Sequence, residues 1–182
     1  MNRIVVNYFL LITVALCISF YFLISGISVG KMIFRDVRFM LQNPSLSYDD
    51  KMRIFWWQVY DYFEFVKQHT PEHAVIVTPP QERPWLTSGN TGIALYFLYP
   101  RKIISGGLYS LPLDKSFDFV MIHKGEWNDA PMDKYNWPKI YITADKIWYL
   151  DPNDKSINVT YKDFDPKDDR NKGALGLIQI KK

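Results

Sequence analysis

The sequence predicts an α/β protein in which an N-terminal apolar helix precedes a small, three-layer-like α/β domain with a partly parallel, partly antiparallel sheet. Residues 4–29 contain no charged side chain. Residues 47–68 have apolar positions at helical spacing, and short β-branched runs follow at 74–78 and 102–105. A helix, a strand, a helix and further strands at this spacing are typical of a layered α/β fold. We expect three regions, namely a membrane anchor at 1–30, a juxtamembrane helix and linker at 31–47, and a soluble domain at 48–182.

The apolar run at 4–29 is long enough to cross a bilayer, because about 20 apolar residues in a helix span a hydrocarbon core of about 30 Å. A cleaved signal peptide has a shorter apolar region of about 7–15 residues and a small-residue cleavage site, which is not found after this run. Residues 14–17 resemble a lipidation box, but Leu16 is bulky where a small residue is required. We therefore expect an uncleaved signal anchor, with the lipid bilayer as a partner.

The orientation of this anchor is open. Arg3 precedes the run, whereas Lys31, Arg35 and Arg38 follow it. A positive-inside count would keep the soluble domain in the cytoplasm. Cys17 is the single cysteine and lies inside the run, so cysteine usage does not fix the compartment.

Composition excludes several functional classes. The net charge of +3 is small, and no stretch interleaves basic and aromatic residues, so we expect no nucleic-acid partner. No P-loop or dinucleotide fingerprint is present. We expect no cofactor, and we favour a non-enzymatic role.

The first elements of the soluble region are helical. Residues 31–42 predict a helix that continues the anchor, lies along the lipid headgroups, or packs as a connector. Asn43-Pro44 ends it. Ser47 with Asp50 forms a capping box that opens a helix to about Gln68.

The predicted strands divide the domain into two halves. Residues 74–78 predict a buried strand, and residues 102–105 and 117–123 predict two more strands. We expect a parallel core, with a right-handed crossover between the first two strands. Residues 91–99 predict a short buried helix, with a strand as the alternative. Further strands, in a more antiparallel half, are expected at 139–142, 146–150, 156–161 and 175–180, the last at an edge of the sheet.

A group of motifs between residues 70 and 102 carries a resemblance. The motifs are Thr70-Pro71-Glu72, residues 74–76, Pro79-Pro80, Pro84-Trp85, Gly89-Asn90 and above all the string YFLYPRK at 96–102. Over residues 48–105 the chain resembles uncharacterised small bacterial membrane-anchored proteins. This resemblance implies a bacterial cell-envelope setting, with the domain on the outer face of the inner membrane. It transfers no catalytic residue.

The carboxyl ends of the parallel strands are the expected ligand edge of such a sheet. Three loops would meet there, and together they offer groups for an anionic or sugar-like ligand. Their candidate residues are Thr78, Gln81, Glu82 and Arg83, then Ser105, Gly106 and Gly107, and finally His123, Lys124 and Glu126. His123 and Glu126 are the candidates for acid–base catalysis. The favoured alternative is that all of these are ordinary polar loop residues.

Other candidates are weaker. Arg101 could bind an anion with its planar guanidinium, but a structural ion pair is the preferred interpretation. His69 and His73 lack a third ligand nearby, so no metal site is expected. The acidic residues Asp163, Asp165, Asp168 and Asp169 do not have the order of a calcium loop. Trp127, Tyr135 and Trp137 predict either a contact surface or the lid of the core.

Three functions remain open from the sequence. The first is an accessory or interaction module of the envelope, which binds another membrane or envelope protein. The second is a ligand-binding or enzymatic domain of envelope glycan metabolism. The third is a small subunit of a membrane complex, in which Asn7, Thr13 and Ser19 of the anchor would pack against other helices.

Overall fold

The computed structural model spans the 182 residues and describes residues 3–111, 116–124, 136–171 and 173–181. The side chains of residues 1–18 and 21–24 also lie outside the description. The chain divides into two compact units, residues 1–51 and residues 52–182, and each is treated separately below.

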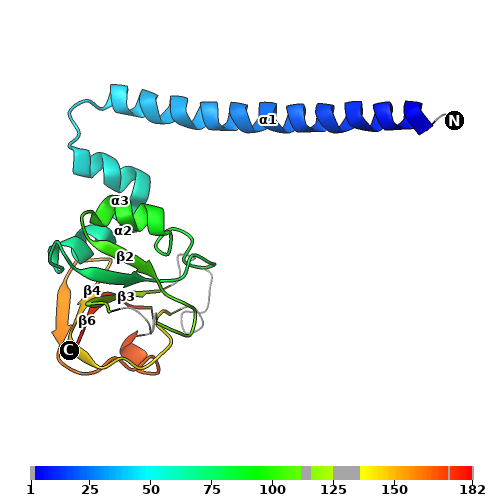
Figure 1. The fold of residues 1–182 in the computed structure, drawn as a ribbon. Helices are drawn as coiled ribbons and strands as arrows, with labels where there is room; N and C mark the ends of the chain where they lie inside the picture. The colour runs from blue at the N-terminus through cyan, green and yellow to red at the C-terminus, as the bar shows by residue number, and fades with distance from the viewer. Residues whose placement is uncertain (1–2, 112–115, 125–135, 172, 182) are drawn as a thin grey trace. The chain divides into compact units, whose positions relative to one another are not determined.

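The N-terminal unit is dominated by one long helix, α1 (Arg3–Gln42) (Figure 1). The predicted helix at 31–42 therefore continues the preceding apolar run without a break. The helix ends where the amide and side chain of Asn43 both donate to Phe39 O, at 3.1 and 2.9 Å. Among the side chains that the structure describes, no helix is both long and apolar enough to span a membrane. Most of the predicted anchor lies outside those side chains, so it stays a prediction.

Helix α2 (Tyr48–Gln68) begins at the predicted capping box. The hydroxyl of Ser47 accepts from Asp50 N at 3.1 Å and donates to the Asp50 carboxylate at 2.6 Å. The helix is not continuous, because Trp57 has φ 48° and ψ −132°. This conformation interrupts the helix and divides it into two segments.

The strands of the described chain form one six-stranded sheet in the order β2-β1-β3-β6-β4-β5. β1 pairs in parallel with both β2 and β3, and β6 pairs antiparallel with both β3 and β4. β5 is antiparallel to β4. The strands are β1 (Val75–Thr78), β2 (Lys102–Ser105), β3 (Phe119–His123), β4 (Ala144–Leu150), β5 (Ile157–Thr160) and β6 (Leu175–Ile180). The mixed α/β class and the partly parallel, partly antiparallel sheet are confirmed.

Two strand predictions were wrong. β6 lies between β3 and β4 in the middle of the sheet and not at an edge. Its residues Leu175, Leu177 and Ile178 are buried, as expected of a strand with neighbours on both sides. Residues 139–142 do not form a strand, since only Ile142 makes a bridge, with Phe164. The preceding Pro138 has no amide hydrogen to contribute to a ladder.

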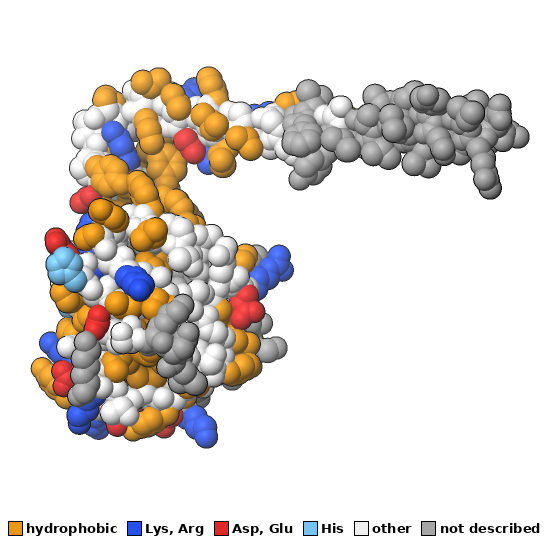
Figure 2. All heavy atoms as spheres, viewed as in Figure 1, with side chains coloured by type: hydrophobic (Ala, Val, Ile, Leu, Met, Phe, Trp, Pro, Cys, Tyr) orange, Lys and Arg blue, Asp and Glu red, His pale blue; other side chains and the backbone are white. Residues whose placement is uncertain are grey.

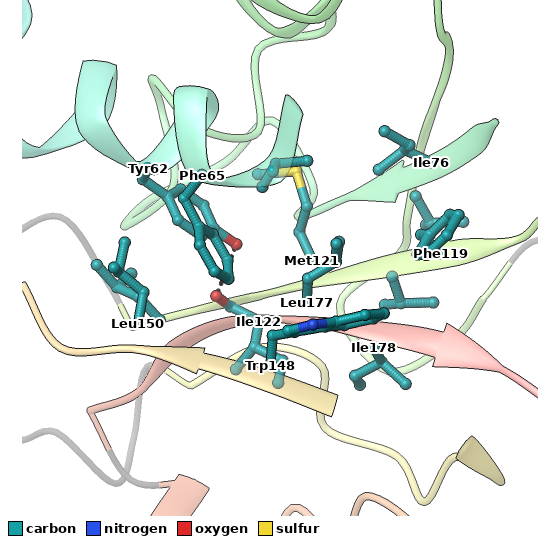
Figure 3. Packing of buried hydrophobic residues seen from close by; sticks show 14 of the residues in the cluster. Tyr62, Phe65, Ile76, Phe119, Met121, Ile122, Trp148, Leu150, Leu177 and Ile178 are labelled. Carbon is teal, nitrogen blue, oxygen red and sulfur yellow. Dashed lines mark hydrogen bonds between the residues drawn. The ribbon is translucent and has the colours of Figure 1, made fainter. Parts of the chain in front are cut away.

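The core lies between the sheet and the C-terminal segment of α2 (Figure 3). Met121, Leu177 and Trp148 are register partners on three neighbouring strands, so their side chains lie on the same face of the sheet. Tyr62 and Phe65 of α2 point toward the sheet in the same view. Both aromatic side chains are buried, and together they attach α2 to the central strands.

Helix α3 (Thr91–Leu98) connects β1 to β2. The Asn90 side chain accepts from Ile93 N at 3.1 Å and caps its N-terminus. The helical interpretation of residues 91–99 is therefore confirmed. A short 3-10 helix, η1 (Asp169–Asn171), precedes β6.

Candidate functional site

The carboxyl ends of β1, β2 and β3 lie side by side. Thr78 and Ser105, the last residues of β1 and β2, are register partners. The amide of Gly106 donates to Thr78 O at 2.9 Å immediately beyond them. Because β3 flanks β1 on the other side, the loops that follow the three strands begin at one edge of the sheet, as the sequence predicted.

Two tryptophans fill this edge. Trp85 and Trp137 are each 1% exposed. The indole of Trp85 donates to His123 O at 3.2 Å, and the indole of Trp137 donates to Gly107 O at 3.0 Å. A Cβ on Gly106 would lie 2.5 Å from Cζ2 of Trp137, so only glycine leaves room for this ring. The two indoles are therefore buried and packed beside the ends of β2 and β3.

The burial of Trp137 decides between its two interpretations. Trp137 is part of the core, and its backbone forms a bridge with His123. It is therefore not part of an exposed contact surface. The other two members of that predicted surface, Trp127 and Tyr135, lie outside the described residues.

His123 is 5% exposed, and its surroundings favour a structural role. Nδ1 pairs with the carbonyl oxygen of Lys124, which fixes the tautomer with its proton on Nδ1. The ring also makes an edge contact with Tyr62 at 5.1 Å between centroids. A general acid or base must reach a substrate proton, and this ring is enclosed by protein.

The remaining loop candidates differ in their exposure and in their local contacts. Arg83 is exposed, Lys124 is half-buried, and Gly107 donates its amide to Ser110 O at 3.0 Å. Glu126 lies outside the described residues. The strand ends thus converge as predicted, while the chemistry proposed for them stays a prediction.

Arg101 holds the end of α2. Its side chain is 5% exposed and donates to Thr70 Oγ1 at 2.6 Å, to Lys67 O at 2.7 Å and to Thr70 O at 2.6 Å. Burial lowers the pKa of Arg101, while the charges of Glu72 and Glu64 raise it. Nε and Nη2 of the guanidinium thus donate to groups at the C-terminal end of α2, where a cation is favourable. None of these three acceptors is a carboxylate, so the ion pair expected from the sequence is not among them.

A charged hollow that the sequence did not indicate lies between α2 and the β4–β5 turn. It has a volume of about 160 Å³. The Asp61 carboxylate is part of its lining, with Arg53 Nε at 2.8 Å from one oxygen and Lys155 Nζ at 3.0 Å from the other. Burial raises the pKa of Asp61, but hydrogen bonds from Arg53 and Lys155 outweigh this effect, and the pKa lies below its usual value.

Two larger hollows lie at other edges of the sheet. One, of about 570 Å³, is lined by His73, Asp118, Asp145 and Lys181 near the amino ends of β1, β3 and β4. Another, of about 440 Å³, is lined by Tyr149, Asn158 and Arg170. No group of three metal-ligating side chains is formed by the described residues. Asp165 and Asp168 accept from amides two residues further along and serve as local turn acceptors, whereas Asp163 accepts from the amide of Ala144 in β4.

The outer side of α3 exposes large apolar side chains. Ala94, Phe97 and Leu98 are buried against the core, yet Leu95, Tyr96 and Tyr99 are 47%, 65% and 73% exposed. Hydrophobic side chains gather in Figure 2 where α3 lies in Figure 1. A helix that is apolar all round is normally buried all round, and this one is covered on one side only.

Comparison of the chain with protein-family models, with curated proteins and with solved structures gives no match. The assignment of function therefore depends on the physical features above.

Proposed function

We propose that the chain is a single-pass membrane protein of the bacterial cell envelope whose three-layer-like α/β domain is an accessory interaction module. The α3 surface, defined as Leu95, Tyr96 and Tyr99, is the contact site for another membrane or envelope protein. The observation that carries this proposal is the exposure of these three side chains on a helix whose opposite side is fully buried.

The composition of the α3 surface fits a protein contact. Tyrosine supplies a large apolar area and a hydroxyl at little conformational cost, and it is enriched in the centres of interfaces. Tyr96 is held in place by an edge contact with the buried Phe97, at 5.1 Å between ring centroids. A preorganised aromatic side chain loses less entropy on binding than a mobile one.

The lipid bilayer is the second partner in the proposal, through the apolar run at 4–29. The soluble domain is placed outside the cytoplasm on the basis of the resemblance to bacterial membrane-anchored proteins, against the positive-inside count of Lys31, Arg35 and Arg38. A compartment-sensitive reporter fused to the C-terminus separates these two orientations. An extracytoplasmic signal supports the proposed setting, and a cytoplasmic signal contradicts it.

Site-specific photo-crosslinking tests the contact site. A photoreactive amino acid at Tyr99 in full-length chain in cells should give one adduct of defined mass. Tyr161 is the matched control, because it is 74% exposed against 73% for Tyr99 and lies next to β5. The same adduct at both positions, or none at Tyr99 from cells in which the chain is membrane-bound, would contradict the proposal. The variant Tyr96→Ser with Tyr99→Ser should abolish the adduct from a probe at Leu95.

A further inference from the structure

The two segments of α2 are joined by a residue with an unfavourable backbone conformation. Among the residues that the structure describes, the non-glycine residues with positive φ are Trp57, at 48°, and Lys155, at 59°. A bulky residue at positive φ is a genuine outlier that the surrounding structure must maintain. The indole of Trp57 does not supply that support within the described domain, because it is 77% exposed.

A pair of charges spans this break. Arg53 precedes Trp57 and Asp61 follows it, and their side chains meet at 2.8 Å. Residues eight positions apart in a continuous α-helix are separated by about 12 Å along the axis. The carboxylate of Asp61 is therefore within direct reach of Arg53 because the chain bends between them.

The same carboxylate is bound from a second side. Lys155 Nζ lies 3.0 Å from the other oxygen of Asp61, and Lys155 is the second positive-φ residue. Its backbone is set by the β4–β5 turn, in which Lys155 N donates to Asp151 O at 2.9 Å. Asp61 thus connects the N-terminal segment of α2, the C-terminal segment of α2 and the β4–β5 turn.

We propose that Asp61, Arg53 and Lys155 form an ionic clasp that holds α2 bent at Trp57, and that α2 has a second, straight conformation when the clasp opens. In the straight form Trp57 has helical φ and ψ, and Arg53 is carried about 12 Å along the axis from Asp61. Such a hinge would change the direction in which the chain leaves the globular unit. This device is independent of the α3 surface.

The ion pairs of Asp61 favour the bent form of α2, and the backbone strain at Trp57 opposes it. The side chains of Arg53 and Lys155 are 42% and 56% exposed, so water and salt screen both pairs. Exposed ion pairs of this kind are individually weak. The strain at Trp57 opposes them, because tryptophan prefers the helical conformation to φ 48°. Trp56 adds a third contribution, because its ring makes an edge contact with Phe97 at 5.3 Å between centroids and favours the bent form.

Distances between two spin labels on α2 test the clasp in the full-length chain in detergent micelles. Ile54→Cys and Gln68→Cys place labels on exposed residues on both sides of Trp57, in a Cys17→Ser background. A straight helix separates these positions by about 21 Å along its axis, and the bent helix brings them closer. We expect Asp61→Asn and Trp57→Ala to lengthen the distance, and 1 M salt to do the same by screening.

Matched variants make the outcome specific. Glu64→Gln removes a neighbouring carboxylate that pairs with Lys67 at 3.5 Å on one side of the bend, so it should leave the distance unchanged. Trp57→Gly should keep the short distance, because glycine accepts positive φ.

A second label pair at Gln68 and Asn158 reports whether the globular unit stays folded. If Asp61→Asn changes the distance between the labels at Gln68 and Asn158, the test uses Arg53→Gln instead, which removes the Arg53–Asp61 ion pair through its other partner. An unchanged distance in the clasp variant that keeps the unit folded overturns the proposal.

Discussion

The phenol oxygen of Tyr62 lies 2.7 Å from the carbonyl oxygen of Ile122, which joins α2 to the central strand β3. The same oxygen lies 2.9 Å from the carbonyl oxygen of Gly176 in β6. Its single proton thus serves two carbonyls of neighbouring strands. Gly176 allows the strands this close, because a Cβ there would lie 2.4 Å from Trp148 O. One buried hydroxyl therefore fixes the position of α2 over the middle of the sheet.

Tyr62→Phe should destabilise the globular unit by about 1–3 kcal/mol, because it removes a donor from two buried carbonyls. Denaturant unfolding of the full-length chain in detergent measures the change. Tyr141→Phe is the control, since Tyr141 is 61% exposed and its hydroxyl bonds the exposed Asp163 at 2.6 Å. Its effect should be below about 0.5 kcal/mol. Equal effects of the two substitutions would show that the Tyr62 hydroxyl is not the stabilising group.

Stability should fall as the pH rises above about 10, the pKa of an unfolded tyrosine. Burial raises the pKa of Tyr62 well above that value, and burial raises the pKa of Tyr149 to about 12. A raised folded pKa means that the stabilisation is complete below pH 10 and is lost toward the folded pKa. Unfolding curves between pH 8 and the folded pKa values check this, together with the phenolate absorbance. Tyr62→Phe should reduce the slope, and an unchanged slope would contradict the assignment.

Gly106→Ala should destabilise the edge where β1, β2 and β3 end. The new methyl group would lie 2.5 Å from Trp137 Cζ2 and 3.1 Å from Thr78 O, so the indole must move. Overpacking of this kind costs about 1–3 kcal/mol. Thermal unfolding and the near-UV signal of the tryptophans measure it. Gly30→Ala is the control, because nothing lies within 4 Å of its Cβ position. A neutral Gly106→Ala would mean that Trp137 is not tightly packed there.

Arg101→Met should destabilise the globular unit by about 1.5–3 kcal/mol, because hydrogen bonds from a charged donor are lost at the end of α2. Arg101→Lys should recover only part of this, since an ammonium group cannot reproduce the planar guanidinium. Lys102→Met, at an exposed neighbouring position, is the control for loss of charge.

The same arginine variants separate a structural role from anion binding. Inorganic phosphate should not raise the melting temperature of the wild-type chain through Arg101, because Nε and Nη2 already donate to Thr70 and Lys67. A phosphate stabilisation that is lost in Arg101→Lys would support the anion-binding role instead.

Local signals in the sequence located most elements of the globular unit. The Ser47–Asp50 box and the β-branched run before Pro79 gave the start of α2 and the place of β1, because caps and buried strands have short-range patterns. The central place of β6 depends on pairing with β3 and β4 far along the chain, which no local pattern specifies. The signal that could have indicated this central place is that residues 175–180 are apolar on both faces of the strand.

The candidate site was harder to predict than the fold. The sequence placed polar loop residues at one edge, but the two tryptophans that occupy this edge come from different loops, and their burial is a property of the folded chain. The Arg53–Asp61 pair was not expected either, because residues eight apart are not neighbours on a regular helix. It becomes a contact only through the backbone of Trp57, whose φ is not encoded by a glycine or proline.

The proposed anchor gives the last prediction, which concerns residues 4–29. Thr13→Arg combined with Leu16→Arg places two charges near the middle of this run, at a cost of about 2.5–3.5 kcal/mol each in membrane insertion. The wild-type chain should stay in the membrane pellet after alkaline carbonate extraction, and the double variant should move substantially to the supernatant. Leu41→Arg is the control, because it adds a charge outside the run at an exposed position of α1. Release of the wild-type chain would contradict the anchor, and equal retention of the double variant would place the membrane attachment in another part of the chain.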